Sequence, residues 1–554
     1  MEEMLAAHAE RSGRIAFVKT GADRLGPRSL SPSAFEDTAR ETAMISCRST
    51  GHQDFSEKQG DSREVAMLSL FRLAKLVKYG LALVMVVLIS VLGVRVHDAL
   101  TGPPLAPWHT YVPDDVTAAR IDEMDWAEYI AAENAVFASV RDNVTRALKP
   151  EHRVAENRYF DGSPLYPGGF TQDWNRSSIL LPDGPAVGMA VFLHGLTDTP
   201  YSLRHIARRY RDRGFVAVTA RMPGHGTVPA GLTEVDWRDW LAATRLSVRE
   251  ASRLAGPDVP LHLVGFSNGG ALALKYAMDA LEDEDLVRPA RIVLISPMVG
   301  ITRFARFAGI AGWPAVFPAF VRSAWLDTVP EFNPFKYNSF PVNGARQAHR
   351  LTTALQNQLT QNARNGRLDQ LAPIITFQSV VDFTVSTQAI ITSLYNILPA
   401  NGSELVLFDI NRMAYFGPLF RTFTSTVLDR LLPAPPRAFR TTVITNAGIA
   451  NAGRDSREVA ERVVEPGAAT EAVRLLGLSY PGDIYSLSHV ALPFPTTDGL
   501  YGLTPDPADD FGIRLGNVST RGELGVLIVS LDAFSRMSSN PFYSYMIERI
   551  EEGI

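Results

Sequence analysis

The sequence predicts an α/β protein built on a doubly wound, mostly parallel β-sheet, and three observations carry this prediction. Apolar runs of strand length alternate with helical patterns from residue 186 onward. One of these runs ends in the pentapeptide Gly265-Phe-Ser-Asn-Gly269, directly before a helical pattern. After an aromatic-rich interruption the alternation resumes at residues 373–409. Strands separated by crossover helices pair in parallel, and such sheets are covered by helices on both faces.

The composition is that of an ordinary globular protein, and it excludes several kinds of site. The 554 residues are 46% hydrophobic and 20% charged, which is enough to bury a large core. The formal net charge of −5 argues against nucleic acid as the main partner, because there is no basic excess to displace counterions. The single cysteine, Cys47, lies in the polar N-terminal tail. Intramolecular disulfides, cysteine-based zinc sites and a cysteine nucleophile in the core are therefore excluded.

The N-terminal 66 residues are polar and show little hydrophobic periodicity, so we expect residues 1–66 to be disordered. Met67 opens a segment that looks like a natural start, and we hypothesise that residues 1–66 are not translated. N-terminal sequencing of the native protein tests this hypothesis.

Residues 67–98 are predicted to form an uncleaved transmembrane anchor. The apolar span covers residues 76–96, close to the ~20 residues that a helix needs to cross a bilayer. The alternatives are a cleaved signal peptide, which lacks a small-x-small exit here, and a buried soluble helix. Cations precede the span and acidic residues follow it. This bias places the N-terminus in the cytoplasm and the rest of the chain on the outer, periplasmic or extracytoplasmic, side.

Residues 99–184 are predicted to be a linker and an N-terminal helical extension. A Pro-rich spacer at 101–109 comes first, and helical patterns follow at about 117–135 and 136–148. The stretch at 157–184 has no regular pattern and is expected to be irregular.

Residues 185–554 are predicted to carry the sheet. The expected strands are 186–193, 215–220, 261–264, 290–296, 373–381, 404–409 and, as an extra one, 440–445. The expected helices are 201–213, 235–255, 271–277 and 386–398. The helix at 201–213 is rich in arginine, and we expect its charges to face solvent.

Two insertions interrupt this pattern. Residues 301–340 hold ten aromatic residues, one in four against 9% for the whole chain. Because they lie between two sheet strands, we expect residues 298–368 to form a cap over the C-terminal edge of the sheet. Most of these aromatics are expected to pack the cap's own core, and a minority to line an apolar pocket. A second insertion is expected at about 410–487.

Ser267 is the candidate nucleophile. It stands between an apolar strand and a helical pattern, where a sharp turn strains the backbone and exposes the hydroxyl. Gly265 and Gly269 are needed because a Cβ at either position would collide with the neighbouring strand and helix. The alternative is a Gly-rich strand–helix turn with an incidental serine.

A serine nucleophile needs a histidine base that a carboxylate holds in the right tautomer. Asp382 follows the strand at 373–381 and should point to the same sheet edge as Ser267; its alternative role is a helix cap. Glu404 and Asp409 are weaker candidates for the acid. Of the eleven histidines only His489 follows Asp382, in a loop-like stretch, and it completes the order Ser, Asp, His.

The oxyanion that forms during acyl transfer needs hydrogen-bond donors. The turn His194-Gly195 ends the first central strand, and in this arrangement one N–H comes from that turn and one from the residue after the nucleophile. These donors are the backbone N–H groups of Leu196 and Asn268. His194 is expected to support the turn, or to be an ordinary strand-end histidine.

A family resemblance rests on five features: Gly265–Gly269, Leu193-His-Gly195, Arg221-Met-Pro-Gly-His-Gly-Thr227, Asp382 and His489. Together these features resemble the α/β-hydrolase superfamily. The nearest branch is the monoglyceride-lipase, carboxylesterase and serine-aminopeptidase-like group, in a membrane-anchored bacterial form. The resemblance covers about 185–300 and 370–410 and does not explain residues 1–150. It departs in one respect: family members usually carry the histidine shortly after the strand that ends here at Asp409, but about 75 residues separate Asp409–Arg412 from His489.

The resulting expectation is a serine hydrolase that cleaves carboxylic esters, of the monoacylglycerol or lysophospholipid type, through an acyl-enzyme. The alternatives are an aminopeptidase or acyltransferase on the same scaffold and a non-catalytic, membrane-tethered binding module. A peptidase would need carboxylates such as Asp327 or Glu331 to bind a substrate amine. No metal or organic cofactor is expected, because the sequence has no metal-binding helix motif and no phosphate-cradling or dinucleotide loop.

Overall fold

The computed structural model describes part of the chain in detail. The described residues are 75–87, 89–90, 93–94, 97, 104–300, 322–382, 384–411, 432–447, 457–482, 484, 486–516 and 536–554. The chain divides into two compact units, Met1–Leu81 and Ala82–Ile554. The sheet and the candidate site both belong to the second unit.

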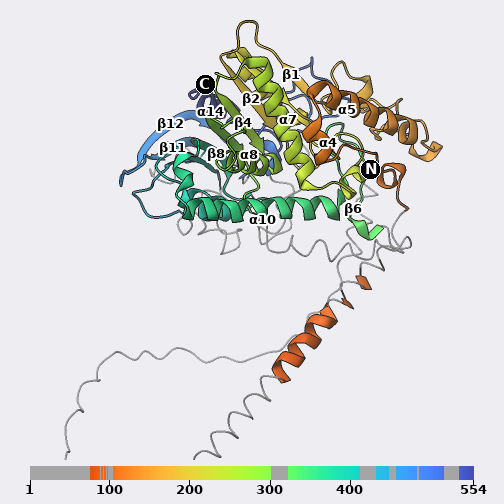
Figure 1. The fold of residues 1–554 in the computed structure, drawn as a ribbon, viewed down its shortest axis with the longest axis horizontal. Helices are drawn as coiled ribbons and strands as arrows, with labels where there is room; N and C mark the ends of the chain where they lie inside the picture. The colour runs from red at the N-terminus through yellow and green to blue at the C-terminus, as the bar shows by residue number, and fades with distance from the viewer. Residues whose placement is uncertain are drawn as a thin grey trace, which may run out of the picture. The chain divides into compact units, whose positions relative to one another are not determined.

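A ten-stranded sheet organises the second unit, with the strand order β1-β3-β2-β4-β5-β8-β9-β10-β11-β12 (Figure 1). Its strands are β1 (Ser178–Leu180), β2 (Gly188–Leu193), β3 (Phe215–Thr219), β4 (Leu261–Phe266), β5 (Arg291–Ile295), β8 (Ile374–Ser379), β9 (Glu404–Asp409), β10 (Arg440–Asn446), β11 (Glu458–Val464) and β12 (Ala472–Ser479). The pairs from β3 to β10 are all parallel. Only the outer strands β1, β11 and β12 pair antiparallel.

Helices cover both faces of this sheet. They are α3 (Pro107–Thr110), α4 (Ala118–Glu123), α5 (Trp126–Val140), α6 (Arg204–Asp212), α7 (Trp237–Ala255), α8 (Asn268–Ala280), α10 (Val342–Arg364), α11 (Thr387–Ser393) and α14 (Tyr543–Glu551). Alternate residues of β2 enter different cores: Met189 and Val191 pack with α7, α8 and α10, and Ala190 and Phe192 pack with α6 and α14. The predicted doubly wound α/β architecture is confirmed.

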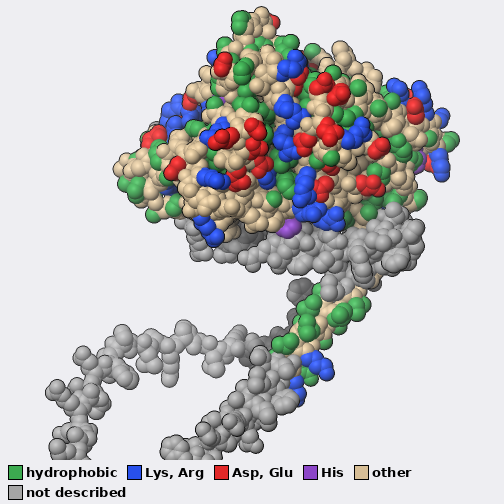
Figure 2. Space-filling model, in the orientation of Figure 1, with side chains coloured by type: hydrophobic (Ala, Val, Ile, Leu, Met, Phe, Trp, Pro, Cys, Tyr) green, Lys and Arg blue, Asp and Glu red, His purple; other side chains and the backbone are tan. Residues whose placement is uncertain are grey.

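Acidic and basic side chains are interspersed on the face of the second unit that Figure 2 shows, over helices α7 and α8. Ion pairs on α7 join Arg245 to Asp122 at 2.6 Å and Arg253 to Glu250 at 2.7 Å. Charges of both signs in close mixture cancel at a distance, so this face presents no large field of one sign.

Two parts of the sheet differ from the prediction. The stretch at 157–184, expected to be irregular, contributes β1, which pairs with β3. Its three residues are too short for a periodicity to show. The strand expected at 440–445 is confirmed as β10, but the region at 410–487, otherwise expected to be an insertion, also contributes β11 and β12 to the sheet. Residues 412–431 and 448–456 of this region lie outside the described residues.

The predicted cap, residues 298–368, is only partly described, because residues 301–321 lie outside the described residues. Its last part is the long helix α10, whose Leu351, Leu355 and Leu359 enter the main core beside α8. The described aromatics pack against other segments, not within a core of their own. Phe335 stacks on Tyr201, with ring centroids 4.1 Å apart, and Trp325 meets His109.

The predicted extension, residues 99–184, packs into the same compact unit as the sheet. Helix α4 lies against α7, and the carboxylate of Asp239 on α7 accepts a hydrogen bond from the backbone N–H of Ala118 at 2.7 Å. Tyr129 on α5 is fully buried in the main core.

The described part of the chain holds no helix both long and apolar enough to cross a membrane. The predicted tail, residues 1–66, lies outside the described residues, as do residues 88, 91, 92, 95 and 96 of the predicted span at 76–96.

Candidate active site

Ser267 occupies a sharp turn between β4 and α8. Its backbone has φ 54° and ψ −116°, a conformation that non-glycine residues adopt only under strain. A Cβ on Gly265 would overlap the carbonyl oxygen of Gly269, and a Cβ on Gly269 would overlap that of Leu193. Both obstacles are backbone atoms that cannot swing aside. The predicted strain at Ser267 and the need for both glycines are confirmed.

Ser267, His489 and Asp382 form one hydrogen-bonded row. His489 Nε2 lies 3.1 Å from Ser267 Oγ, and His489 Nδ1 lies 2.7 Å from Asp382 Oδ2. A carboxylate only accepts hydrogen bonds, so Nδ1 carries the proton and Nε2 is left to accept one from the serine. All three residues are buried. The structure thus brings together the three side chains that the sequence singled out.

Asp382 is held by its other oxygen. Oδ1 accepts hydrogen bonds from the backbone N–H groups of Thr384 at 2.8 Å and Val385 at 3.1 Å. The carboxylate therefore organises its own turn and also faces His489, while Ser386, not Asp382, caps the following helix α11. These two anchors fix which oxygen points at the imidazole.

The loop that carries His489 is attached to the end of the sheet. Ser379, the last residue of β8, donates its hydroxyl to the carbonyl of Leu487 at 3.0 Å. Leu487 belongs to β13 (Ser486–Leu487), which pairs with β14 (Arg536–Met537). Ser488 caps the short 3-10 turn His489–Ala491. The imidazole stacks on Phe266, with ring centroids 5.4 Å apart, so the residue before the nucleophile supports the histidine.

A buried ion pair fixes the chain just beyond His489. Asp498 accepts hydrogen bonds from Arg204 Nη1 at 2.8 Å, from the hydroxyl of Tyr201 at 2.9 Å and from His205 Nε2 at 3.0 Å. Arg204 and Asp498 are both buried, which corrects the expectation that the arginines of this helix all face solvent. Burial alone raises the pKa of Asp498, but the Arg204 charge and the His205 hydrogen bond outweigh it and hold the pKa below its ordinary value.

Asp498→Asn is expected to lower the free energy of unfolding by about 3 kcal/mol, because it leaves the buried Arg204 charge poorly compensated. This loss lies at the low end of the range for broken buried ion pairs, because Asp509 also pairs with Arg204, at 3.2 Å. Chemical denaturation measures it. The control is Glu551→Gln, whose carboxylate pairs with the half-exposed Arg209 and should cost less than about 1 kcal/mol. Equal losses in the two variants would contradict the role given to Asp498.

The stabilisation that Asp498 provides by pairing with Arg204 depends on pH in a defined way. The pKa of Asp498 is lower in the folded protein than its ordinary value of about 3.9 in the unfolded chain. The contribution of Asp498 to the free energy of unfolding is therefore fully present above the unfolded-state pKa and is lost as the pH falls below it. The stability difference between wild type and Asp498→Asn should shrink in acid.

The predicted oxyanion turn lies against the nucleophile. A Cβ on Gly195 would stand 3.2 Å from the Cβ of Ser267. Within the described part of the chain, no backbone hydrogen bond engages the N–H groups of Leu196 and Asn268. Asn268 is the first residue of α8, so its N–H also lies at the positive end of the helix dipole. Both groups are therefore available to an anion at Ser267.

His194 connects this turn to the next one, as the sequence predicted. Its Nε2 accepts a hydrogen bond from the backbone N–H of Met222 at 3.1 Å. The proton therefore resides on Nδ1, which donates to the carbonyl of Gly195 at 2.9 Å. Burial holds the pKa of His194 well below its ordinary value, so the ring stays neutral.

The Arg221–Thr227 turn is clamped by the N-terminal extension, a role that the resemblance left unexplained. Arg221 is fully buried and forms two hydrogen bonds to Asp115, at 2.8 and 2.9 Å. Glu133 adds an ion pair at 3.3 Å, and the hydroxyl of Tyr129 donates to the Arg221 carbonyl at 2.6 Å. Asp115 also accepts the N–H of Gly224 at 2.8 Å. These partners lie 88 to 109 residues apart in the chain, so the pairing gives no local sequence signal.

The competing candidates have other partners. Glu404 accepts a hydrogen bond from Thr442 at 2.7 Å and pairs with Arg549. His262 is buried, with Nδ1 3.3 Å from the hydroxyl of Tyr210, as expected for a structural residue. Glu331 is buried and accepts the backbone N–H groups of Asn338 and Ser339 at 2.9 and 2.7 Å. Its carboxylate is thus already engaged and is a poor candidate to bind a substrate amine.

Within the described residues, no group of three or more His, Cys, Asp or Glu side chains is arranged to hold a metal ion. What the site offers is acid–base and nucleophilic chemistry at Ser267.

A mostly parallel sheet with a Ser–His–Asp row at a strand–helix turn is the arrangement of the α/β-hydrolase class. The chain belongs to the alpha/beta hydrolase family, whose model matches residues 190–473, just over half of the 554 residues.

The chain is similar to a thermostable monoacylglycerol lipase from Bacillus sp. (strain H-257). The two are 30% identical over 179 residues, which are 32% of this chain and 66% of that protein, just under two thirds of its length.

Solved structures of lipolytic enzymes are similar at lower identity. One structure belongs to a study of LipS and LipT, two metagenome-derived lipolytic enzymes. It is 22% identical to this chain, with a TM-score of 0.34, and the match covers 42% of this chain and 86% of that chain. Another structure is that of a soluble variant of monoglyceride lipase from Saccharomyces cerevisiae. It is 14% identical to this chain, with a TM-score of 0.34, and the match covers 42% of this chain and 81% of that chain. With TM-scores this low, neither likeness carries an argument about substrate.

Proposed function

We propose that the protein is a serine hydrolase that cleaves carboxylic esters through an acyl-enzyme. The observation that carries the proposal is the hydrogen-bonded row from Ser267 through His489 to Asp382 at the strained turn. A serine alone is a poor nucleophile at neutral pH, and this row supplies the base and the group that orients it.

The reaction proceeds in two halves. Ser267 Oγ bonds to the ester carbonyl carbon while its proton passes to His489 Nε2, and the carbonyl electron pair moves onto oxygen. The N–H groups of Leu196 and Asn268 stabilise this oxyanion. When the intermediate collapses, the C–O bond breaks and His489 returns the proton to the leaving alcohol. Water then repeats the sequence on the acyl-enzyme and releases the acid, and Asp382 stabilises the imidazolium formed in each half.

The substrate class that we propose is a lipid-like ester of the monoacylglycerol or lysophospholipid type. The similarity to a monoacylglycerol lipase supports it, as does the apolar segment at 76–96. A panel of p-nitrophenyl esters of rising acyl length tests the proposal: kcat/KM should be higher for medium or long chains than for acetate. A clear preference for acetate would contradict it.

We also propose that residues 76–96 anchor the protein in a membrane, with the N-terminus cytoplasmic and residues beyond the span on the outer side. The support is the length of this apolar segment and the cations before it. If this is correct, the full chain remains with membranes after alkaline extraction, and an external protease digests the domain after residue 99 in cells with a permeabilised outer layer. Recovery of the full chain in the extracted supernatant would contradict the anchor.

A further inference from the structure

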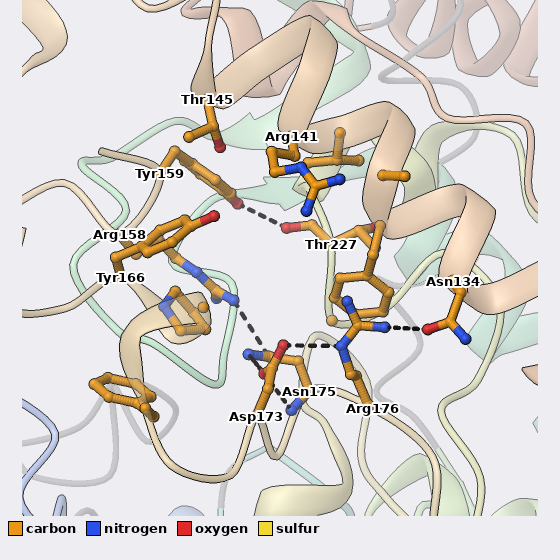
Figure 3. Close-up of a pocket in the computed structure, with 17 residues that line it drawn as sticks. Asn134, Arg141, Thr145, Arg158, Tyr159, Tyr166, Asp173, Asn175, Arg176 and Thr227 are labelled. Carbon is orange, nitrogen blue, oxygen red and sulfur yellow. Dashed lines mark hydrogen bonds and ion pairs between the residues drawn. The ribbon is translucent and has the colours of Figure 1, made fainter. Parts of the chain in front are cut away.

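A cavity of about 500 Å³ lies between α5, the π-helical turn Arg141–Thr145 that follows it and the loops before β1 (Figure 3). None of Ser267, Asp382, His489 or the His194–Leu196 turn lines it. Its volume falls in the range of small-molecule sites. π-Helical turns are rare and are found mostly at functional sites. The cavity is thus a candidate binding site separate from the nucleophile.

The lining of this cavity carries a net positive charge. Arg141, Arg158 and Arg176 all line it, and Asp173 is the one acidic residue among the described residues that do so. Figure 3 shows the three guanidinium groups around the same hollow, approaching from different segments of the chain. Three cations and one anion leave a formal charge of about +2 for a ligand to neutralise.

Arg158 is the most buried of these cations, with 2% of its surface exposed. Its Nη1 donates to the carbonyl of Asn333 at 2.9 Å, and its Nη2 donates to Asn175 Oδ1 at 3.2 Å, while Nε is buried with no hydrogen-bond partner. The buried carboxylate of Glu331 interacts with this charge at longer range, but its oxygens accept from Asn338 and Ser339 instead. A buried cation without a paired carboxylate destabilises a fold, so an anion bound here would offset that cost.

The other two arginines are only partly engaged. Arg176 pairs with Asp173 at 3.3 Å, and its Nη1 donates to Asn134 Oδ1 at 2.8 Å. Its guanidinium also lies over the ring of Phe137, 3.8 Å from the ring centroid. Arg141 is about half exposed, and its Nε is 4.0 Å from Asp142, at the limit of an ion pair. Because the Arg141 side chain is exposed, it can turn toward a ligand at little cost.

We propose that this cavity binds the phosphate monoester group of an organic ligand. A phosphate monoester carries about −1.5 to −2 charges at pH 7, which matches the formal charge of the lining. Guanidinium N–H groups donate charge-assisted hydrogen bonds to phosphate oxygens, and three guanidinium groups surround one hollow. The rings of Phe137, Tyr166 and Phe170 supply an apolar wall for the organic part of the ligand.

Calorimetric titration of the full chain with phenyl phosphate tests the site, and benzyl alcohol, the uncharged probe, should bind at least tenfold more weakly. Arg141→Gln should weaken binding of phenyl phosphate about tenfold, the scale of one lost charge-assisted hydrogen bond. The matched control is Arg146→Gln on the next turn, which does not line the cavity and pairs with Asp142 at 2.6 Å. Because both side chains are exposed, neither change threatens the fold.

The phosphate monoester can belong to a soluble molecule or to a lipid headgroup, and a second arm distinguishes them. The full chain is titrated with dihexanoyl phosphatidic acid and, as the control lipid, with dihexanoyl phosphatidylcholine. Binding of phenyl phosphate alone indicates a soluble ligand. Tighter binding of the phosphatidic acid than of phenyl phosphate, weakened by Arg141→Gln, indicates a headgroup.

Two results overturn the proposal: binding of neither phosphate probe, or equal binding by wild type and Arg141→Gln. All titrations are repeated with Ser267→Ala, which should bind as wild type does because Ser267 does not line the cavity. Failure of this phosphate site is therefore distinguishable from failure of the proposed esterase.

Discussion

Ser267→Ala is expected to lower kcat/KM for ester hydrolysis by about 10⁶-fold, the scale seen when the nucleophile of a serine hydrolase is removed. The Oγ atom is the one that must bond to the carbonyl carbon, and no other group in the row can replace it. Steady-state rates on a p-nitrophenyl ester of the preferred acyl length measure the loss.

The variant should remain folded, which makes the result interpretable. The Oγ atom makes its hydrogen bond to His489, and alanine keeps the Cβ that packs beside Gly195. The strained φ of 54° is imposed by the turn and is unchanged by the substitution. A folded Ser267→Ala protein that retained more than a small fraction of the wild-type rate would contradict the proposed nucleophile.

Asp382→Asn is expected to lower kcat by about 10⁴-fold through the wrong histidine tautomer. The two backbone N–H groups of Thr384 and Val385 require an acceptor, so the amide oxygen of the new side chain would take the place of Oδ1. The amide NH₂ would then face His489 Nδ1 and donate to it. Nδ1 would become the acceptor, Nε2 would carry the proton, and His489 could no longer accept one from Ser267.

The matched control is Asp409→Asn, because Asp409 was the competing candidate for the acid and ends the neighbouring strand β9. Its activity should stay within a few-fold of wild type. If Asp409→Asn lost activity and Asp382→Asn did not, the identity of the acid would be wrong. Circular dichroism and thermal unfolding of both variants separate a chemical effect from loss of the fold.

The sequence predicts the central elements well because each leaves a local signal. The buried strands β2, β4, β5 and β8 are short, mostly apolar runs, and helices at 3.6-residue periodicity separate them. The turn at Ser267 has glycines where a Cβ has no room. Asp382 and His489 follow from the order of residue types along the chain.

What the sequence did not predict rests on contacts between distant segments or on weak patterns. Strand β12 lies at the sheet edge with most of its residues exposed, and Arg474 and Gly477 interrupt its apolar residues. The pair Arg204–Asp498 joins residues 294 positions apart, so no local pattern predicts it, and Arg204 is expected from the sequence to face solvent. Beyond the predicted strand at 440–445, the expected insertion before His489 also includes strands β11 and β12 of the sheet.

The most direct test of the proposed mechanism is covalent labelling of the full chain with a fluorophosphonate, read by mass spectrometry. The reagent reacts with a serine that a neighbouring base has activated, and the adduct stands for the acyl-enzyme. We predict one adduct per chain, on the peptide that contains Ser267, absent from Ser267→Ala and strongly slowed in Asp382→Asn. A folded wild-type protein that gives no adduct, or an adduct that persists in Ser267→Ala, would contradict the proposal that Ser267 is the nucleophile.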